Sequence, residues 1–268
     1  MISIYFVRHG QAGTRDSYDS LSDLGRRQAR LLGQYFAAQS IRFATAYSGT
    51  QMRQQQTAAE IAAAYSEAGL RVPFPAITAN EGWNEFDLDL IYREMAPKLC
   101  AEDPDFRRAY EKMREQVRAS RGAHDAEIHR RWTPCDVLMV AAWIQGRYAY
   151  SGESWDAFRA RIAACDPAAS LSSNGCALHL PATAAQADSP AEVNPADRAN
   201  VVVFTSATPT AVWVGRALDI HDGRVMQLAG ALHNASYSIV RRRSNAQLQV
   251  YMFNAVPHLG APELRTRR

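Results

Sequence analysis

Lysine is nearly absent from this sequence, and its net positive charge is small. Lys98 and Lys112 are the only lysines, so arginine accounts for almost all of the 30 basic residues. The formal net charge is +3, and the basic residues form no dense block. A protein dedicated to binding nucleic acid concentrates positive charge in such a block. We therefore expect no nucleic-acid partner.

Cysteines and long apolar runs are also scarce. The four cysteines have no Cys-x-x-Cys or other metal-ligand spacing: Cys100, Cys135, Cys165 and Cys176. No apolar run approaches the roughly 18 residues of a membrane span. The first residues have the pattern of a strand, and no basic segment precedes them as in a secretory leader. These absences predict a cytoplasmic protein with reduced thiols and no membrane contact.

The first third of the chain alternates between strand and helix patterns. Residues 2–7 and 43–47 are short apolar runs of the kind that form buried parallel strands, and residues 72–77 are a further candidate. A helical pattern begins after Ser22, a suitable N-cap, and another covers residues 48–66. This rhythm predicts an α/β fold, a three-layer sandwich in which helices flank a mostly parallel sheet.

The middle of the chain departs from this rhythm. Residues 88–165 have almost only helical patterns, and the pair Thr133-Pro134 is a helix start that favours a helix over residues 137–143. We expect this block to be a helical insertion that covers one end of the sheet. Residues 170–200 are rich in Ala, Ser, Pro and Asn, and we expect them to form a flexible loop.

Regular patterns return in the last quarter of the chain. Residues 201–204 have the pattern of a central strand, and residues 209–218 that of a helix. Two closing strands are expected at residues 237–241 and 248–253, where apolar and polar residues alternate. We expect the chain, residues 1–268, to form a single domain.

Two segments that could carry catalytic or binding residues follow expected strands directly. Arg8-His9-Gly10 comes after the first strand, and ligands of open α/β sheets bind at the carboxyl ends of such strands. Residues 48–58 begin just after the second strand and place Arg53 near a helix N-terminus, where free N–H groups attract anions. Taken alone, His9 in the first segment could have only a structural role. Arg53 in the second segment could be an ordinary solvated arginine of a helix.

Together these segments resemble the histidine phosphatase superfamily, the phosphoglycerate mutase-like proteins, over nearly the whole chain. The family's first motif is a strand that ends in Arg-His-Gly. Its second motif, Leu-Thr/Ser-x-x-Gly-x-x-Gln-Ala, matches residues 21–29. Its third, a serine followed five residues later by arginine and then by Thr-Ala, matches residues 48–58. The three motifs occur in the family's order.

The resemblance implies specific roles for three residues. His9 would be the nucleophile that accepts the phosphoryl group as a phosphohistidine, for which a neutral imidazole is required. Arg8 and Arg53 would clamp the phosphoryl oxygens, since positioned cations are the main catalytic resource in phosphoryl transfer. The family mechanism implies neither a metal nor another cofactor.

The family also uses a carboxylate that protonates the leaving oxygen. Glu81 and Glu85 are both candidates, and an exposed loop acid is the structural alternative for each. Trp83 stands where the family has a leucine two residues before its glutamate, so we favour Glu85 as the general acid.

One departure from the family pattern concerns its second histidine. That position, after the strand at residues 201–204, falls on Ser206. A serine can donate a hydrogen bond to a phosphoryl oxygen but brings no charge, and loss of one such donor costs about 3–4 kcal/mol in the transition state. His233 and His258 are substitutes to consider, although a structural role is favoured for each.

A second departure bears on mutase activity. Mutase-type members carry an asparagine several residues after the nucleophile, whereas this chain has Gln11 and no such asparagine. Gln11 can still reach a phosphate. Asn234 and Ser236 resemble an Asn-x-Ser that precedes a closing strand in some members, and we interpret them as structural.

The sequence thus predicts a phosphomonoester hydrolase that acts through a phosphohistidine on a small phosphorylated substrate. His9, Glu85, Arg8 and Arg53 are the predicted catalytic residues, and the predicted substrate contacts are those of Arg8, Gln11, Arg53 and Ser206. Residues 143–150 and the insertion would shape the substrate pocket. A catalytically impaired phosphoester-binding protein is the alternative from another class, and a mutase is a third. No pattern indicates an oligomeric state.

Overall fold

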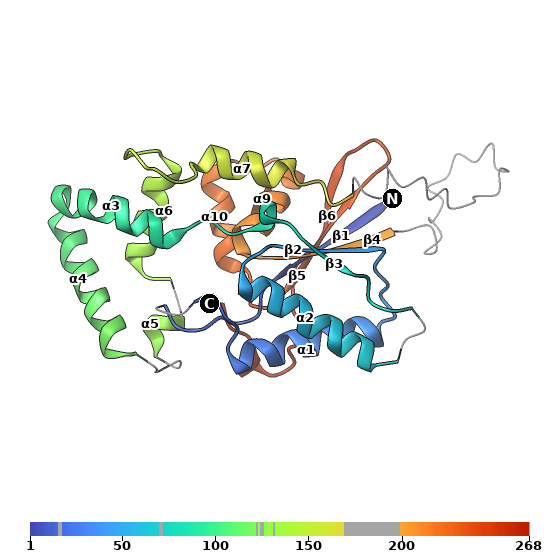
Figure 1. Ribbon diagram of the computed structural model, residues 1–268. Helices are drawn as coiled ribbons and strands as arrows, with labels where there is room; N and C mark the ends of the chain where they lie inside the picture. The colour runs from blue at the N-terminus through green and yellow to red at the C-terminus, as the bar shows by residue number, and fades with distance from the viewer. Residues whose placement is uncertain are drawn as a thin grey trace.

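The computed structural model describes residues 1–15, 18–69, 72–121, 123, 126–130, 132–168 and 199–267. Its centre is a six-stranded sheet of strand order β3-β2-β4-β1-β5-β6 (Figure 1). The strands are β1 (Ile2–Arg8), β2 (Thr45–Ser48), β3 (Ile77–Ala79), β4 (Ala199–Thr205), β5 (Tyr237–Arg242) and β6 (Leu248–Ala255). Strands β1 to β4 are mutually parallel, and β5 runs antiparallel to both of its neighbours, β1 and β6. The predicted α/β fold with a mostly parallel sheet is confirmed.

Helices cover both faces of this sheet. Helices α1 (Asp23–Ala38) and α2 (Met52–Glu67) lie on one face, and α9 (Ala207–Leu218) lies on the other with α10 (Asp222–Ala231) packed against it (Figure 1). Strand β1 alternates between the two sides. Ile4 and Phe6 join the core beneath α9, whereas Tyr5 and Val7 join the core beneath α1 and α2. Burial on both faces explains why β1 is apolar at nearly every position up to Val7.

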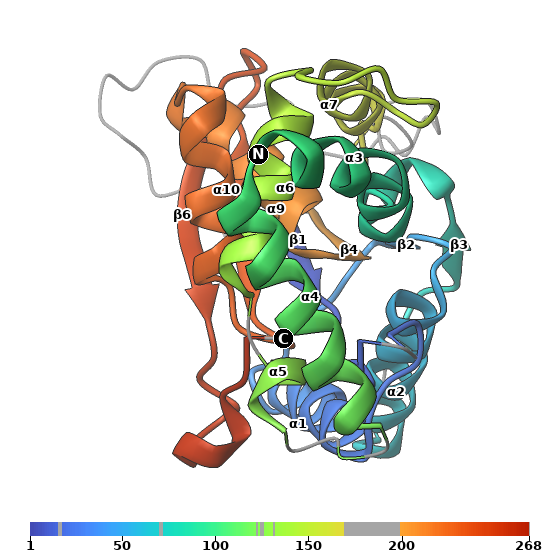
Figure 2. The same ribbon diagram turned by 90° about the vertical axis from the view of Figure 1, so that its left-hand side faces the viewer.

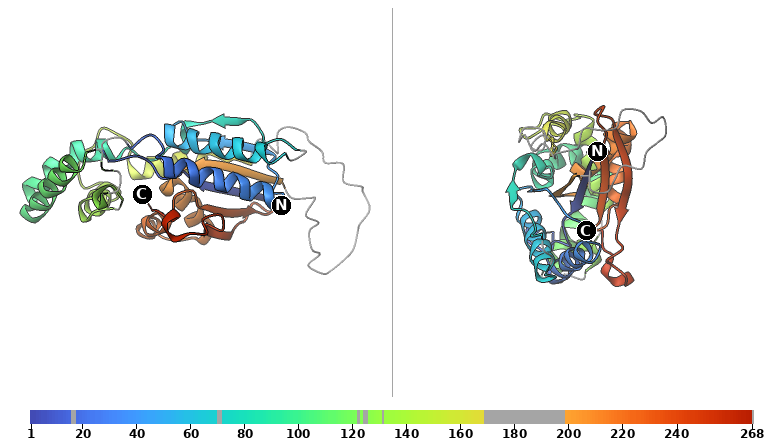
Figure 3. Two further views of the ribbon diagram at one scale, coloured as in Figure 1. Left: turned by 90° about the horizontal axis from the view of Figure 1, so that it is seen from below. Right: turned by 90° about the vertical axis from the view of Figure 1, so that its right-hand side faces the viewer.

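In its described part, the segment between β3 and β4 consists of helices and the loops that connect them, with no strand. It contains α3 (Leu88–Glu102), α4 (Pro104–Ala119), α5 (Glu127–Arg130), α6 (Pro134–Ile144) and α7 (Trp155–Ala164). Helices α3 and α4 project beyond the sheet, on the side away from the N-terminus and thus beyond the carboxyl end of β1 (Figures 1, 2 and 3). The helix predicted over residues 137–143 is confirmed as part of α6, because Thr133 and Asp136 form a capping box at its start.

The structure differs from the predicted elements in several places. The third strand begins at Ile77 and not at residue 72, because Pro73 and Pro75 have no N–H groups for a strand ladder. Helix α10 and the 3₁₀ helix η1 (Glu81–Trp83) were not predicted. The loop predicted at residues 170–200 lies outside the described residues, apart from Ala199 and Asn200, which belong to β4.

In the described part of the chain, no helix is both long enough and apolar enough to cross a membrane.

Candidate active site

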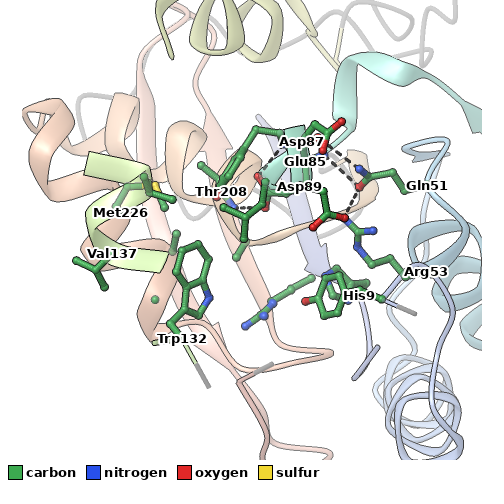
Figure 4. A pocket seen from close by; sticks show the side chains of 18 of the residues that line it. His9, Gln51, Arg53, Glu85, Asp87, Asp89, Trp132, Val137, Thr208 and Met226 are labelled. Atoms are coloured by element: carbon green, nitrogen blue, oxygen red, sulfur yellow. Dashed lines mark hydrogen bonds between the residues drawn. The ribbon is translucent and has the colours of Figure 1, made fainter. Parts of the chain in front are cut away.

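A pocket of about 1110 Å³ lies at the carboxyl ends of β1 and β4. Arg8 and His9 reach it from the end of β1, and Arg53 from the first turn of α2. The segment before α3 contributes Glu85, and the first turn of α9 contributes Thr208. Helices α6 and α10 supply the remaining wall. Figure 4 shows His9 and Arg53 side by side, with Glu85 above them, between Thr208 and Gln51.

The imidazole of His9 is held in one orientation. Its side chain is buried, with an exposed fraction of 2%. Nδ1 lies 2.7 Å from the carbonyl oxygen of Gly10. Because a carbonyl oxygen can only accept, Nδ1 must carry the proton in this hydrogen bond, and the lone pair of a neutral ring is then on Nε2. This arrangement leaves Nε2 without a proton in the neutral ring.

Two glycines allow the loop after β1 to pack closely on α1. A Cβ atom at Gly10 would lie 2.4 Å from the carbonyl oxygen of Gly25, too close for any other residue. The N–H of Gly10 donates to the hydroxyl of Thr57 at 3.0 Å, and this hydroxyl donates to the carbonyl of Arg53 at 2.7 Å. Residues of all three sequence motifs therefore meet beside His9.

Arg8 is buried at the end of β1, with an exposed fraction of 4%. Its terminal nitrogens donate to the carbonyl of Leu232 and, at 2.7 Å, to the carbonyl of Arg267. These contacts fix a guanidinium group in the pocket wall, and its buried Nε–H has no acceptor in the described part of the chain.

Arg53 forms the second buried cation, with an exposed fraction of 7%. It donates to Asp19 at 2.9 Å and to the amide oxygen of Gln51 at 2.7 Å. Its guanidinium lies 5.0 Å from the ring centroid of Tyr18, and that ring stands edge-on to His9 at 6.0 Å. Within the described residues its Nε also lacks a partner.

The two cations and burial together keep His9 neutral. Burial lowers the pKa of His9 well below its ordinary value of 6.5, and the charges of Arg53 and Arg8 lower it further, against the opposing hydrogen bond to Gly10. The imidazole is therefore in its nucleophilic form at neutral pH.

Of the two candidate acids, the structure places Glu85 and not Glu81 in the pocket. Glu85 is half-buried and accepts a hydrogen bond from the Thr208 N–H at 3.0 Å. Burial raises the pKa of Glu85 from its ordinary value of 4.5. Glu81 is exposed and is absent from the pocket lining. The geometry agrees with the preference for Glu85.

Two predicted substrate contacts are not brought to the pocket. Ser206 is buried behind the wall, where its hydroxyl accepts from the Gln54 amide at 2.9 Å, and the following Ala207 lines the pocket instead. Gln11 is also absent from the lining, because its amide oxygen accepts from the hydroxyl of Ser22 at 2.8 Å. Both side chains serve hydrogen bonds within the fold.

The two histidines considered as substitutes also lie outside the pocket lining. The backbone N–H of His233 donates to Asn254 at 2.8 Å. His258 lies beside the ring of Tyr35, and burial lowers its pKa to about 4. Asn234 accepts from the hydroxyl of Thr266 at 2.9 Å, which agrees with the interpretation of this residue as structural.

Sequence reasoning missed three residues at the cationic end of the pocket: Tyr18, Asp19 and Gln51. Tyr18 and Asp19 lie in the loop between the first two motifs, where no periodicity marks them. Gln51 lies two residues before Arg53, and this spacing within the third motif was the available signal. No group of three His, Cys, Asp or Glu side chains suited to a metal ion occurs in the chain as far as it is described.

Solved structures of similar fold cover nearly the whole chain. A mycobacterial glucosyl-3-phosphoglycerate phosphatase in complex with inorganic phosphate is 18% identical, with a TM-score of 0.55, and the match covers 96% of this chain and 98% of that one. A phosphoglycerate mutase from Bacillus anthracis is 15% identical, with a TM-score of 0.52 and coverage of 96% and 95%. A protein described as mycobacterial hydrolase 2 is 18% identical, with a TM-score of 0.51 and coverage of 98% and 94%. No curated protein matches the chain.

A family model identifies the chain more directly than these distant structural similarities. The model of the histidine phosphatase superfamily (branch 1) matches residues 4–142, which is more than half of the sequence. The matched range includes Arg8, His9, Arg53 and Glu85, the four residues that the pocket brings together. The chain therefore belongs to the histidine phosphatase superfamily.

Proposed function

We propose that the protein hydrolyses phosphomonoesters through a phosphohistidine on Nε2 of His9. The observation that carries this proposal is the buried imidazole beside two buried guanidinium groups, with its Nδ1 proton fixed on the Gly10 carbonyl. A phosphate ester that enters the pocket would meet the nucleophile and both cations at one end. The phosphatase among the structural neighbours supports the same reaction class.

In the first step, Nε2 of His9 attacks phosphorus and a P–N bond forms. The P–O bond to the alcohol breaks, and Glu85 gives its proton to the departing oxygen. Burial supports this role because it raises the pKa of Glu85 and so favours the protonated carboxyl. Arg8 and Arg53 neutralise the charge on the three transferring oxygens.

In the second step, water attacks the phosphohistidine. The Glu85 carboxylate accepts the proton of this water, the P–N bond breaks, and inorganic phosphate leaves with His9 restored as neutral imidazole. No metal takes part in either step. The resemblance aligns Ser206 with the family's second histidine, and because a serine carries no charge, we expect slow turnover.

The decisive test compares wild type with His9→Ala. Wild type should release phosphate slowly from p-nitrophenyl phosphate and from alkyl and sugar phosphates, and His9→Ala should show none above background. Rapid acid-free quenching of the wild type with labelled substrate should trap a phosphohistidine. His233→Ala, which alters a histidine outside the pocket lining, is the control and should retain activity. Equal phosphate release by wild type and His9→Ala would refute the proposal.

A second candidate is a phosphoester-binding protein without turnover. It is supported by Ser206, an uncharged residue that the resemblance aligns with the family's second histidine and whose hydroxyl accepts from Gln54 outside the pocket lining. Binding of vanadate or phosphate, measured by calorimetry, without phosphate release or a trapped phosphohistidine would support this candidate over the hydrolase.

A further inference from the structure

The side of the pocket away from His9 is apolar, and α6 forms much of it. Val137, Val140, Ala141 and Ile144 all line the pocket, and their spacing places them on one face of the helix. A helix in a globular protein normally turns such a stripe toward the core. Here Val137 retains an exposed fraction of 59%, so the end of the stripe faces open space.

Helix α10 faces the same space with two glycines, Ala229, Met226 and one polar side chain, that of Gln227. Gly223, Met226 and Gly230 line the pocket at the same helical spacing. A Cβ atom at Gly223 or Gly230 would meet no atom within 4 Å, so packing does not require glycine at either position. Glycine weakens a helix relative to alanine, and its effect here is to leave volume in the pocket unfilled.

The apolar side chains lie together and apart from the charged end. Figure 4 shows Trp132, Val137 and Met226 gathered on one side of the pocket, with His9 and Arg53 on the other. The pocket, at about 1110 Å³, is much larger than a phosphate group requires. A ligand anchored at His9 would therefore extend its remaining atoms over hydrocarbon.

The charges in the pocket disfavour a second anionic group on the ligand. Three arginines line it, and the terminal nitrogens of each already have acceptors. Arg8 donates to two backbone carbonyls, Arg15 makes a bidentate pair with Asp136 at 3.0 and 2.5 Å, and Arg53 contacts Asp19. Besides Glu85, three carboxylates line the pocket: Asp19, Asp87 and Asp89. A carboxylate on the substrate would meet like charges there.

We propose that the substrate is a phosphomonoester of an apolar alcohol, with its phosphate at His9 and its hydrocarbon between α6 and α10. This substrate class rests on the proposed phosphatase function of the same site. The proposal predicts that esters with a second charge, such as 3-phosphoglycerate, are inefficient substrates.

A homologous series of n-alkyl phosphates, from ethyl to decyl and below the micellar concentration of each, tests the proposal. Each methylene that enters the apolar side should raise kcat/KM roughly fourfold, until the pocket is filled. 3-Phosphoglycerate should be a poorer substrate than butyl phosphate. A flat dependence of kcat/KM on chain length would overturn the proposal.

Adjacent residues on α6 provide a matched pair of variants. Val137 lines the pocket and Leu138 does not, yet both side chains are exposed, with fractions of 59% and 46%. Val137→Asp should flatten the dependence on chain length, whereas Leu138→Asp should leave it unchanged. Equal behaviour of the two variants would count against an apolar subsite, and thermal unfolding of each will show whether it is folded.

Binding of n-alkylphosphonates separates this inference from the proposed function. These compounds have no ester bond to break, so their Kd values, measured by calorimetry, do not depend on turnover. A Kd that falls with chain length in a protein without phosphatase activity would refute the hydrolase and retain the apolar subsite. Hydrolysis with no dependence of Kd on chain length would retain the hydrolase and refute the apolar subsite.

Discussion

At the scale of single residues, burial acts on the proposed nucleophile and the proposed acid in the same chemical sense. It lowers the pKa of His9 and raises that of Glu85, so in both cases it favours the neutral form. A neutral imidazole is a nucleophile and a neutral carboxyl is a proton donor. The same desolvated pocket therefore prepares both groups for opposite tasks.

These shifts predict the pH dependence of kcat/KM. His9 is active above its lowered pKa, so the acidic limb should lie well below pH 6.5. Glu85 is active below its raised pKa, so the basic limb should lie above pH 4.5. Glu85→Gln should remove the basic limb and lower kcat/KM for an alkyl phosphate about 10²–10⁴-fold. The loss should be smaller for p-nitrophenyl phosphate, whose leaving group needs less protonation. An unchanged basic limb in Glu85→Gln would exclude Glu85 as the acid.

Ser206 illustrates how a position in a motif can differ from a position in a site. The sequence predicted a weak contact with the phosphoryl group, but the hydroxyl is directed to Gln54 behind the wall. Ser206→Ala should therefore change kcat/KM less than about threefold. It should lower the free energy of unfolding by about 1 kcal/mol, through loss of one buried hydrogen bond. A large fall in kcat/KM in a variant of normal stability would restore the predicted contact.

At the scale of elements, a buried ion pair joins the loop after β1 to α6. Arg15 and Asp136 have exposed side-chain fractions of 9% and 0%. Asp136 also accepts from the hydroxyl of Tyr92 at 2.8 Å and caps α6 through Thr133. The pair therefore fixes the apolar helix of the pocket relative to the strand that carries His9.

Removal of one partner should be strongly destabilising. Asp136→Asn would leave the Arg15 charge buried without its counterion, and we expect a loss of about 3–5 kcal/mol in the free energy of unfolding. Asp105→Asn is the matched control, since its pair with Arg108 on α4 is exposed and should contribute almost nothing. Urea titrations of both variants provide the comparison, and similar small effects would contradict this account.

The elements that could be predicted from sequence are those whose pattern has a single explanation. Strand β1 could be predicted from its apolar run, and helix α6 from its Thr133-Pro134 start. Helix α10 was missed because Gly223 and Gly230 interrupt its pattern. The same glycines leave room in the pocket, so the feature that gives the site its volume also concealed the helix.

The candidate site also contains residues that could be predicted from sequence and residues that could not. His9 and Arg53 could be identified because each occupies a motif directly after a strand. Tyr18 could not, because its place beside His9 depends on how an irregular loop folds back. The apolar half of the pocket could not be predicted either, since it requires α6 and α10 to face each other across the pocket. The residue spacing within one helix does not indicate which other helix it faces.

At the scale of the whole molecule, the insertion and the sheet share one hydrophobic core. A single cluster of buried residues includes Phe6 of β1, Trp213 of α9, Met95 of α3 and Met139 of α6. The ring of Phe86 stacks on Trp143 at 4.6 Å and so joins the segment before α3 to α6. The insertion therefore has no separate core of its own among the described residues.

This shared core predicts cooperative unfolding of the chain. Met139→Ala, in the insertion, and Val203→Ala, in the sheet, alter fully buried members of the same cluster. Each should lower the free energy of unfolding by about 2–5 kcal/mol and shift one common transition. Coincident curves from far-ultraviolet circular dichroism and tryptophan fluorescence would support the predicted single domain. Two separate transitions would divide the insertion from the sheet.

The hydrogen bond between Nδ1 of His9 and the Gly10 carbonyl has a consequence for the regiochemistry of the intermediate. With Nδ1 engaged, only the distal ring nitrogen is available for phosphorylation, so the trapped species should be the tele isomer and not the pros isomer. Phosphorus NMR and isomer-selective antibodies distinguish the two. Detection of the pros isomer would mean that the imidazole ring rotates before it reacts.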